Sequence, residues 1–175
     1  SSFSFAILGS GAIAGLISAA LGTNKRINRL SMFSSWSERL DDVRKHGGIR
    51  FRRPLLQNSD VETVCSSLEL YDLSDLSKSS IGASAKELEA FILHSLSSSS
   101  PTSSSSLTNS KDVSPPFNIK THNIDSSVKG CFDLVLLCGK AYQVESQAAL
   151  AALLVKPRDG LVVPFYNGSD SLEYL

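Results

Sequence analysis

The feature that most constrains this chain is a glycine-rich turn between two apolar segments near its start. Residues 3–8, Phe-Ser-Phe-Ala-Ile-Leu, form a short apolar run that predicts a buried strand. The next six residues, Gly9-Ser-Gly-Ala-Ile-Ala14, match the pattern G-x-G-x-x-A. A helix ending near Gly22 is predicted next, because apolar residues recur on one helical face: Ile13, Leu16, Ile17, Ala20 and Leu21. A strand, a turn and a helix in this order indicate the start of an α/β fold.

This turn has the residues that a dinucleotide-binding loop requires. Gly9 would permit the tight turn, Gly11 would let a pyrophosphate approach the backbone, and Ala14 would keep the helix and the strand close. Free N–H groups at the helix N-terminus would then face the phosphates. We therefore predict cofactor binding by six consecutive residues: Gly9, Ser10, Gly11, Ala12, Ile13 and Ala14. The alternative is a glycine-rich turn that binds no ligand.

The rest of the chain continues the alternation of strands and helices. Apolar patterns predict strands at residues 30–33, 49–51, 118–121, 132–138 and 160–165, and helices at 38–45 and 143–155. The run Phe132–Cys138 is apolar except at Asp133 and does not alternate with polar residues, as expected of a strand in a parallel sheet that is covered on both faces. We therefore predict a Rossmann-like, doubly wound α/β fold over residues 1–175, with a mostly parallel sheet and helices on both faces.

One segment does not fit this pattern. Serine accounts for 33 of the 175 residues, and nine of the twelve residues from Ser95 to Ser106 are serine. Such a stretch cannot bury enough apolar surface to offset the entropy lost on ordering. We expect residues 77–116 to be a disordered, low-complexity insertion, although residues 87–96 place four apolar side chains on one helical face: Leu88, Phe91, Ile92 and Leu96.

Charge and hydropathy argue against two classes of partner. The 17 basic and 17 acidic residues balance, and the pI is near 6.8, so neither nucleic acid nor an anionic membrane surface is expected as a partner. The uncharged stretch from Phe3 to Gly22 has the length of a membrane helix, and this is an alternative interpretation. It is disfavoured because Gly9, Ser10 and Gly11 divide the stretch into a strand-like and a helix-like part.

Cysteine and histidine spacing bears on metals and on the compartment. The three cysteines are odd in number and form no C-x-x-C pair: Cys65, Cys131 and Cys138. They predict free thiols in a reducing compartment, expected to be the cytoplasm, with an organelle as the open alternative. The three histidines are far apart and have no ligand-type spacing: His46, His94 and His122. No metal site is therefore predicted.

The loop after the second predicted strand bears on the choice of cofactor. A site for NAD is expected to place an acidic residue there to hold the ribose hydroxyls. Here the sequence is Ser34-Ser-Trp-Ser-Glu-Arg39, in which no acid closes the strand. Ser35 and Arg39 are therefore predicted to hold a 2′-phosphate through charge-assisted hydrogen bonds, which favours NADP. A solvated arginine on a helix face is an equally good interpretation of Arg39.

Several motifs of the chain occur together, in a fixed order. They are Gly9-Ser-Gly-Ala-Ile-Ala-Gly15, Glu38-Arg-Leu40 leading to Gly47-Gly48-Ile49, Asp133-Leu-Val-Leu-Leu137 with Lys140-Ala-Tyr-Gln143, and Asn167-Gly168. In these motifs the chain resembles the ketopantoate reductases (2-dehydropantoate 2-reductases) over residues 3–52 and 118–175, and the segment that begins at Lys140 is the most specific part. Two positions depart from the family: the third glycine is Ala14, and an arginine common after the second strand falls at about Trp36.

The resemblance implies an activity and a second domain. Ketopantoate reductases use NADPH to reduce 2-dehydropantoate to pantoate, a step of pantothenate biosynthesis, in a cleft between a Rossmann-like domain and a helical C-terminal domain. Lys140 and Asn167 match family positions at the nicotinamide and substrate side of that cleft. The family's catalytic lysine and a substrate-binding glutamate belong to the helical domain, which is expected to be absent from this chain. We therefore assign no catalytic residue here and expect this chain alone to be inactive.

Other interpretations stay open at this point. The chain is expected to be a domain excerpt or a truncated gene product, and the missing initiator Met favours an excerpt. The expected partners are a small 2-oxo acid, the helical C-terminal domain and, in the full-length protein, a second copy in a homodimer. One alternative is another NAD(P)-dependent hydroxyacid dehydrogenase on the same frame. The other is a Rossmann-like binding module without catalysis.

Overall fold

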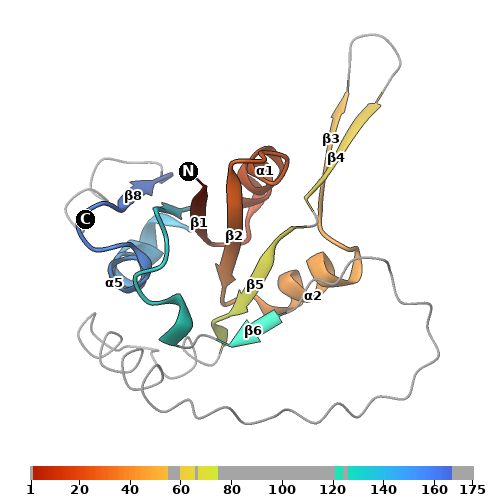
Figure 1. The fold of residues 1–175 in the computed structure, drawn as a ribbon. Helices are drawn as coiled ribbons and strands as arrows, with labels where there is room; N and C mark the ends of the chain where they lie inside the picture. Colours follow the sequence, from red (N-terminus) through yellow and green to blue (C-terminus); the bar gives the residue numbers. More distant parts are fainter. Residues whose placement is uncertain (1, 55–59, 66, 75–120, 124–125, 167–175) are drawn as a thin grey trace, which may run out of the picture.

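The architecture is a central β-sheet covered by helices, with one projecting hairpin (Figure 1). The computed structural model describes residues 2–54, 60–65, 67–74, 121–123 and 126–166. The predicted insertion at 77–116, the predicted helix at 87–96 and Asn167 lie outside the described residues. Within the described part of the chain, none of the helices has the length and apolar content needed to span a bilayer.

A parallel sheet of six strands forms the centre. Its strands are β1 (Phe3–Leu8), β2 (Ile27–Ser34), β5 (Glu69–Asp72), β6 (Thr121–Asn123), β7 (Leu134–Leu137) and β8 (Leu161–Pro164). They lie in the order β6-β5-β2-β1-β7-β8, and every neighbouring pair is parallel. The chain therefore builds outward from β1 in one direction through β2, β5 and β6, and in the other through β7 and β8. The predicted α/β architecture with a mostly parallel sheet is confirmed.

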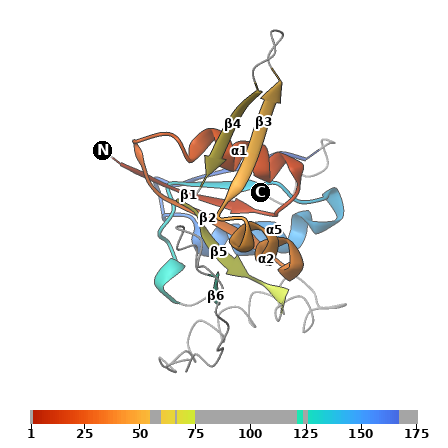
Figure 2. The ribbon, with the colours of Figure 1, turned by 90° about the vertical axis from the view of Figure 1, so that its right-hand side faces the viewer.

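Helices cover both faces of this sheet (Figures 1 and 2). Because side chains alternate along a strand, Ile7 packs in one core, with α1 (Ala12–Leu21) and α2 (Ser37–Lys45), while Leu8 packs in the other, with α5 (Val144–Leu154). The first core takes Ala14 from α1 and Leu40 and Val43 from α2. The second takes residues of α5 and two aromatic rings of the sheet region: Leu150, Ala151, Leu154, Phe33 and Phe132. Both faces are covered, which is why the central strand β7 is a continuous apolar run, Leu-Val-Leu-Leu.

The hairpin is formed by β3 (Ile49–Pro54) and β4 (Asp60–Cys65), which pair with each other in antiparallel fashion. Its base packs against α1 at positions without side chains. A Cβ built on Gly15 would lie 3.7 Å from Ile49 Cγ2, and one built on Gly22 would lie 2.3 Å from Cys65 Sγ. The two glycines therefore permit the close approach of α1 and the hairpin. Burial raises the pKa of the Cys65 thiol to about 11.

Most predicted elements are present, with shifted bounds. The predicted helices at 38–45 and 143–155 correspond to α2 and α5. Of the predicted strand at 118–121, only Thr121 lies within the described residues, where it begins β6. The expected strand at 49–51 belongs to the hairpin instead of continuing the alternating order of the sheet. Strand β5 takes the place beside β2, where it lies parallel. Residues 126–128 and 141–143 form short 3₁₀ turns that no pattern predicted.

Candidate functional site

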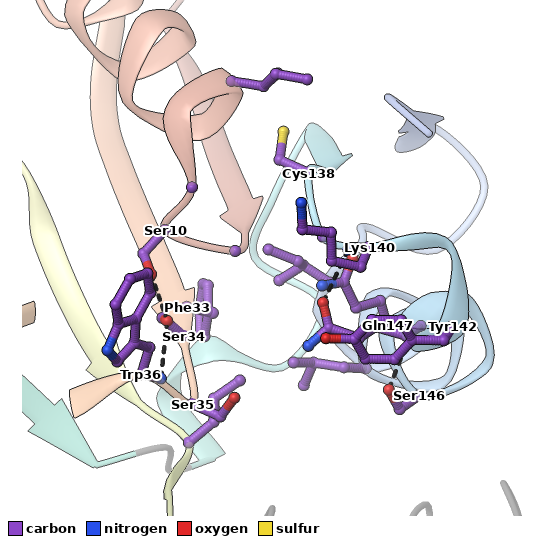
Figure 3. Close-up of a pocket in the computed structure, with 18 of the residues that line it drawn as sticks. Ser10, Phe33, Ser34, Ser35, Trp36, Cys138, Lys140, Tyr142, Ser146 and Gln147 are labelled. Carbon is purple, nitrogen blue, oxygen red and sulfur yellow. Dashed lines mark hydrogen bonds between the residues drawn. The ribbon is translucent and has the colours of Figure 1, made fainter. Parts of the chain in front are cut away.

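A cavity of about 690 Å³ opens at the carboxyl ends of β1, β2 and β7. From β1 the chain first adds β2, β5 and β6 on one side, and then crosses over to add β7 and β8 on the other side of β1. The cavity therefore lies at the point between β1 and β7 where the strand order reverses. Open α/β sheets bind ligands at such switch points, outside the carboxyl ends of the strands. The lining comes from residues 8–13, 33–36, 73, 138–140, 142, 143, 146, 147 and 150. Figure 3 shows the two walls that these segments form.

The first half of the glycine turn is held tightly between the neighbouring strands. Gly9 has φ +120°, a conformation that other residues rarely adopt, and a Cβ there would lie 2.9 Å from the Cys138 carbonyl oxygen. The Gly9 N–H donates to the Phe33 carbonyl at 2.8 Å, and the Cys138 N–H donates to the Leu8 carbonyl at 2.8 Å. The turn is therefore tied to β2 on one side and to the end of β7 on the other.

The second half of the turn faces the cavity. A Cβ built on Gly11 would meet no atom within 4 Å, so the space beside this backbone is open. Gly11 is the residue that precedes α1, and no side chain caps the N–H groups of the first helical turn. Ala14 is fully buried beneath them, in the core between α1 and the sheet. The helix therefore presents unoccupied backbone donors and its positive dipole end to the cavity.

One wall of the cavity, which we call the β2 wall, consists of the residues at the end of β2. Ser10 and Ser34 are both buried, and their hydroxyl oxygens lie 2.7 Å apart in a hydrogen bond. Ser34 Oγ also accepts a hydrogen bond of 3.1 Å from the Trp36 N–H. The Trp36 ring lies along this wall near Ser10 (Figure 3), and 57% of the residue is exposed. Ser35 is also exposed and lines the cavity.

The opposite wall, the β7 wall, begins at Gly139. A Cβ at Gly139 would lie 2.2 Å from Gln147 Nε2, so the Gln147 amide occupies the space beside the Gly139 backbone. The Lys140 N–H donates to Gln143 Oε1 at 2.8 Å, and the Tyr166 hydroxyl donates to Gln147 Oε1. Lys140 is the only charged side chain among the described lining residues. Its ammonium is therefore the one positive group that the described cavity offers to an anion.

Two weakly acidic groups near this wall, the Cys138 thiol and the Tyr166 hydroxyl, stay protonated. Burial raises the pKa of the Cys138 thiol to about 12, and burial together with Cys138 raises the pKa of the Tyr166 hydroxyl. Both groups are therefore neutral near pH 7. A thiol with this pKa is a poor nucleophile, because the thiolate is the reactive form. The cavity is accordingly suited to binding by hydrogen bonds and charge, with no activated nucleophile among its described residues.

The structure brings most of the predicted site residues together. Those that line the cavity are Gly9, Ser10, Gly11, Ala12, Ile13, Ser35 and Lys140. Ala14 lies behind the turn, as the packing role predicted for it requires. Arg39 lies in the first turn of α2 and is not a lining residue, and Asn167 lies outside the described residues. The cofactor-binding roles themselves stay predictions.

Sequence reasoning missed part of the β7 wall. Ser146 and Gln147 line the cavity from α5, together with Leu150. Gln143, Ser146 and Gln147 are spaced as i, i+3 and i+4, which places polar groups on one face of an otherwise alanine- and leucine-rich helix. That spacing was the available signal. Within the described residues, no group of three His, Cys, Asp or Glu side chains could hold a metal ion.

We compared the chain with protein-family models, curated proteins and solved structures, and none of them matched it.

Proposed function

We propose that this chain is the Rossmann-like, NADP-binding domain of an oxidoreductase similar to the ketopantoate reductases. The observation that carries this proposal is the glycine turn of residues 9–14, which opens onto the cavity at the switch point of a parallel sheet. The open space beside Gly11 suits the close approach of a pyrophosphate to the backbone. Uncapped N–H groups at the start of α1 add hydrogen-bond donors for it.

The absence of a carboxylate from the described β2 wall supports NADP as the cofactor. The residues there are Ser34, Ser35 and Trp36, so no described group of this wall would repel a 2′-phosphate. Arg39 is partly exposed in the first turn of α2, three residues after Trp36. We therefore retain Arg39 and Ser35 as the proposed 2′-phosphate ligands.

The proposed reaction is the reduction of a 2-oxo acid, with 2-dehydropantoate as the substrate that the resemblance implies. NADPH, when bound, supplies hydride chemistry to such a carbonyl. Residues of this chain would hold and orient the cofactor: the amides of residues 10–14 at the pyrophosphate, and the Lys140 ammonium and Asn167 on the nicotinamide and substrate side. We assign the proton donor to the helical C-terminal domain of such enzymes. A cytoplasmic, reducing location is proposed with it, supported by three cysteines that are all free thiols.

The experiment that tests this proposal is a titration of the chain with NADPH and with NADH, in which binding is measured by calorimetry. We expect saturable binding of both, with NADPH tighter by about tenfold, or about 1.4 kcal/mol. Replacing Gly11 with leucine should abolish binding, because the new side chain would fill the space beside the turn without touching the protein core. The matched control is Ala20→Leu, an exposed position of the same helix away from the turn. Equal NADPH affinity of Gly11→Leu and the unchanged chain would refute the proposal.

A further inference from the structure

The largest side chain of the β2 wall is left exposed beside the cavity. Trp36 is 57% exposed, although an indole ring normally gains more by burial than most side chains. Its neighbours Phe33 and Leu40 are buried in the two cores, so the ring is excluded from cores that lie immediately beside it. An exposed aromatic ring that lines a cavity is a surface on which a flat ligand group can stack.

The backbone of Trp36 is held in place by the glycine turn. Its N–H donates to Ser34 Oγ at 3.1 Å, and Ser34 Oγ lies 2.7 Å from Ser10 Oγ. The Trp36 carbonyl in turn accepts hydrogen bonds from the N–H groups of Arg39 and Leu40 at the start of α2. The backbone that carries the ring is thus hydrogen-bonded through both the N–H and the carbonyl of Trp36. Its position is coupled to the turn that would hold a pyrophosphate.

The surroundings of the ring offer little that could read the edge of a base. The hydroxyl of Ser34 is already engaged twice, by Ser10 and by the Trp36 N–H. Phe33 and Leu73 are apolar, which leaves the Ser35 hydroxyl as the only uncommitted polar side chain among the described residues of this wall other than Trp36 itself. Such a wall suits recognition by stacking, in which every base has an equivalent π-face.

We propose that Trp36 is the platform on which the adenine ring of the cofactor stacks, and that this end of the site tolerates changes at the base edge. The inference rests on the proposed dinucleotide function and specifies how its adenosine half is held. It makes Trp36 a specificity-determining residue: the adenosine half is selected as a flat ring linked to phosphates. Hydrogen bonding to the adenine amino group contributes little to this selection.

The test is calorimetric binding to the unchanged chain, Trp36→Leu, Trp36→Phe and the control Phe3→Leu. Phe3 is an exposed aromatic residue at the opposite end of β1, away from the cavity. The ligands are NADPH, its hypoxanthine analogue, adenosine 2′,5′-bisphosphate and nicotinamide mononucleotide. Trp36→Leu should weaken NADPH and the bisphosphate by about tenfold and leave the mononucleotide unchanged, since stacking on one ring is worth roughly that factor. Trp36→Phe should retain most of the affinity, and the hypoxanthine analogue should bind the unchanged chain within about threefold of NADPH.

The possible failures are separable. If the unchanged chain binds NADPH and Trp36→Leu binds it equally well, the stacking platform is wrong while the dinucleotide site stands. A hypoxanthine analogue that binds tenfold more weakly than NADPH would overturn base tolerance in the same way. If the unchanged chain binds none of the four ligands, the proposed function itself is wrong. Circular dichroism on each variant shows whether a loss reflects unfolding, and Trp36→Met, which also lacks an aromatic ring, repeats the test if Trp36→Leu does not fold.

Discussion

The two ends of the parallel sheet use their polar groups in opposite ways. At the amino end, the Asp133 carboxylate accepts hydrogen bonds from the Ser4 N–H at 2.8 Å and the Ser4 hydroxyl at 2.7 Å, and pairs with Lys156 Nζ at 2.6 Å. Arg29 and Glu69 form a second pair there at 2.9 Å. At the carboxyl end, Lys140 forms no ion pair within the described residues and lines the cavity. The polar groups of the amino end therefore connect strands to one another, whereas the Lys140 ammonium at the carboxyl end is available to a ligand in the cavity.

The difference separates stability from binding. Groups at the amino end connect the start of β1 with β7 and the segment after α5, so their loss should reduce stability without touching the cavity. At the carboxyl end, the Lys140 and Ser35 side chains are exposed and line the cavity, so the loss of either should affect a ligand more than the fold. The variants below are arranged to test this separation.

The largest effect on stability is expected from Asp133→Asn. The hydrogen bonds from Lys156 and Ser4 lower the pKa of Asp133 to about 2, below its value of about 3.9 in an unfolded chain. A depressed pKa means that the stabilisation is complete above about pH 4 and is lost as the pH falls toward 2. The variant should lose about 2 kcal/mol of unfolding free energy at pH 7 and show a flatter stability profile between pH 4 and 2.

Urea unfolding at several pH values measures both effects of this substitution. The control is Asp159→Asn, an exposed carboxylate with no side-chain partner among the described residues. NADPH binding by the folded Asp133→Asn protein should be unchanged. A variant as stable as the control, or one with weakened NADPH binding, would contradict the separation between the two ends.

Lys140→Met should show the reverse behaviour. Lys140 is exposed, so its removal should change the unfolding free energy by less than about 0.5 kcal/mol. Its ammonium is the only described positive group of the cavity, so NADPH should bind about tenfold more weakly. Calorimetry at low and high salt measures the loss, which should shrink as salt screens the charge.

The matched control for Lys140→Met is Lys129→Met. Lys129 is also exposed, but it follows the 3₁₀ turn at 126–128 and is not a lining residue. If the two variants weakened NADPH binding equally, the charge of Lys140 would act only through the net charge of the protein, and its place in the site would be wrong.

The smallest effect is expected from Ser18→Ala on the buried side of α1. The Ser18 hydroxyl is fully buried and has no hydrogen-bond partner in the described part of the chain. Alanine removes this unpaired group and is the better helix former, so the unfolding free energy should rise by up to about 1 kcal/mol. NADPH binding should not change, since Ser18 is not a lining residue. Thermal unfolding measures the gain. A variant whose unfolding free energy fell by more than about 1 kcal/mol would contradict this prediction, because it would mean that the Ser18 hydroxyl makes a stabilising hydrogen bond.

Local patterns were sufficient to predict the central strands and helices. The apolar run of β1, the spacing of α1 and the continuous run of β7 each follow from a short window of sequence, and all three are present. The hairpin was not predicted, because Ile49 and Phe51 alternate with arginines in the same way whether their strand joins the sheet or pairs with β4. Strand β5 was not predicted, because it has only four residues and an acidic residue at each end.

The site was predictable in part for the same reason. The glycine turn is a contiguous motif, so its place between a strand and a helix could be inferred directly. The β7 wall depends on how α5 packs beside Gly139, which no local window contains. The orientation of Arg39 depends on where α2 begins. The helix starts at Ser37, which puts Arg39 at the third position of its first turn, and Arg39 is not a lining residue.

The most direct test of the separation between the two ends is an amide chemical-shift titration of the isotope-labelled chain with NADPH. The account predicts the largest shifts at the amides of residues 10–14, followed by those of Trp36 and Lys140. It predicts no comparable change at Ser4 or Asp133, at the amino end of the sheet. Saturating NADPH that left the amides of the glycine turn unmoved, or that shifted the Ser4 and Asp133 amides most, would contradict it.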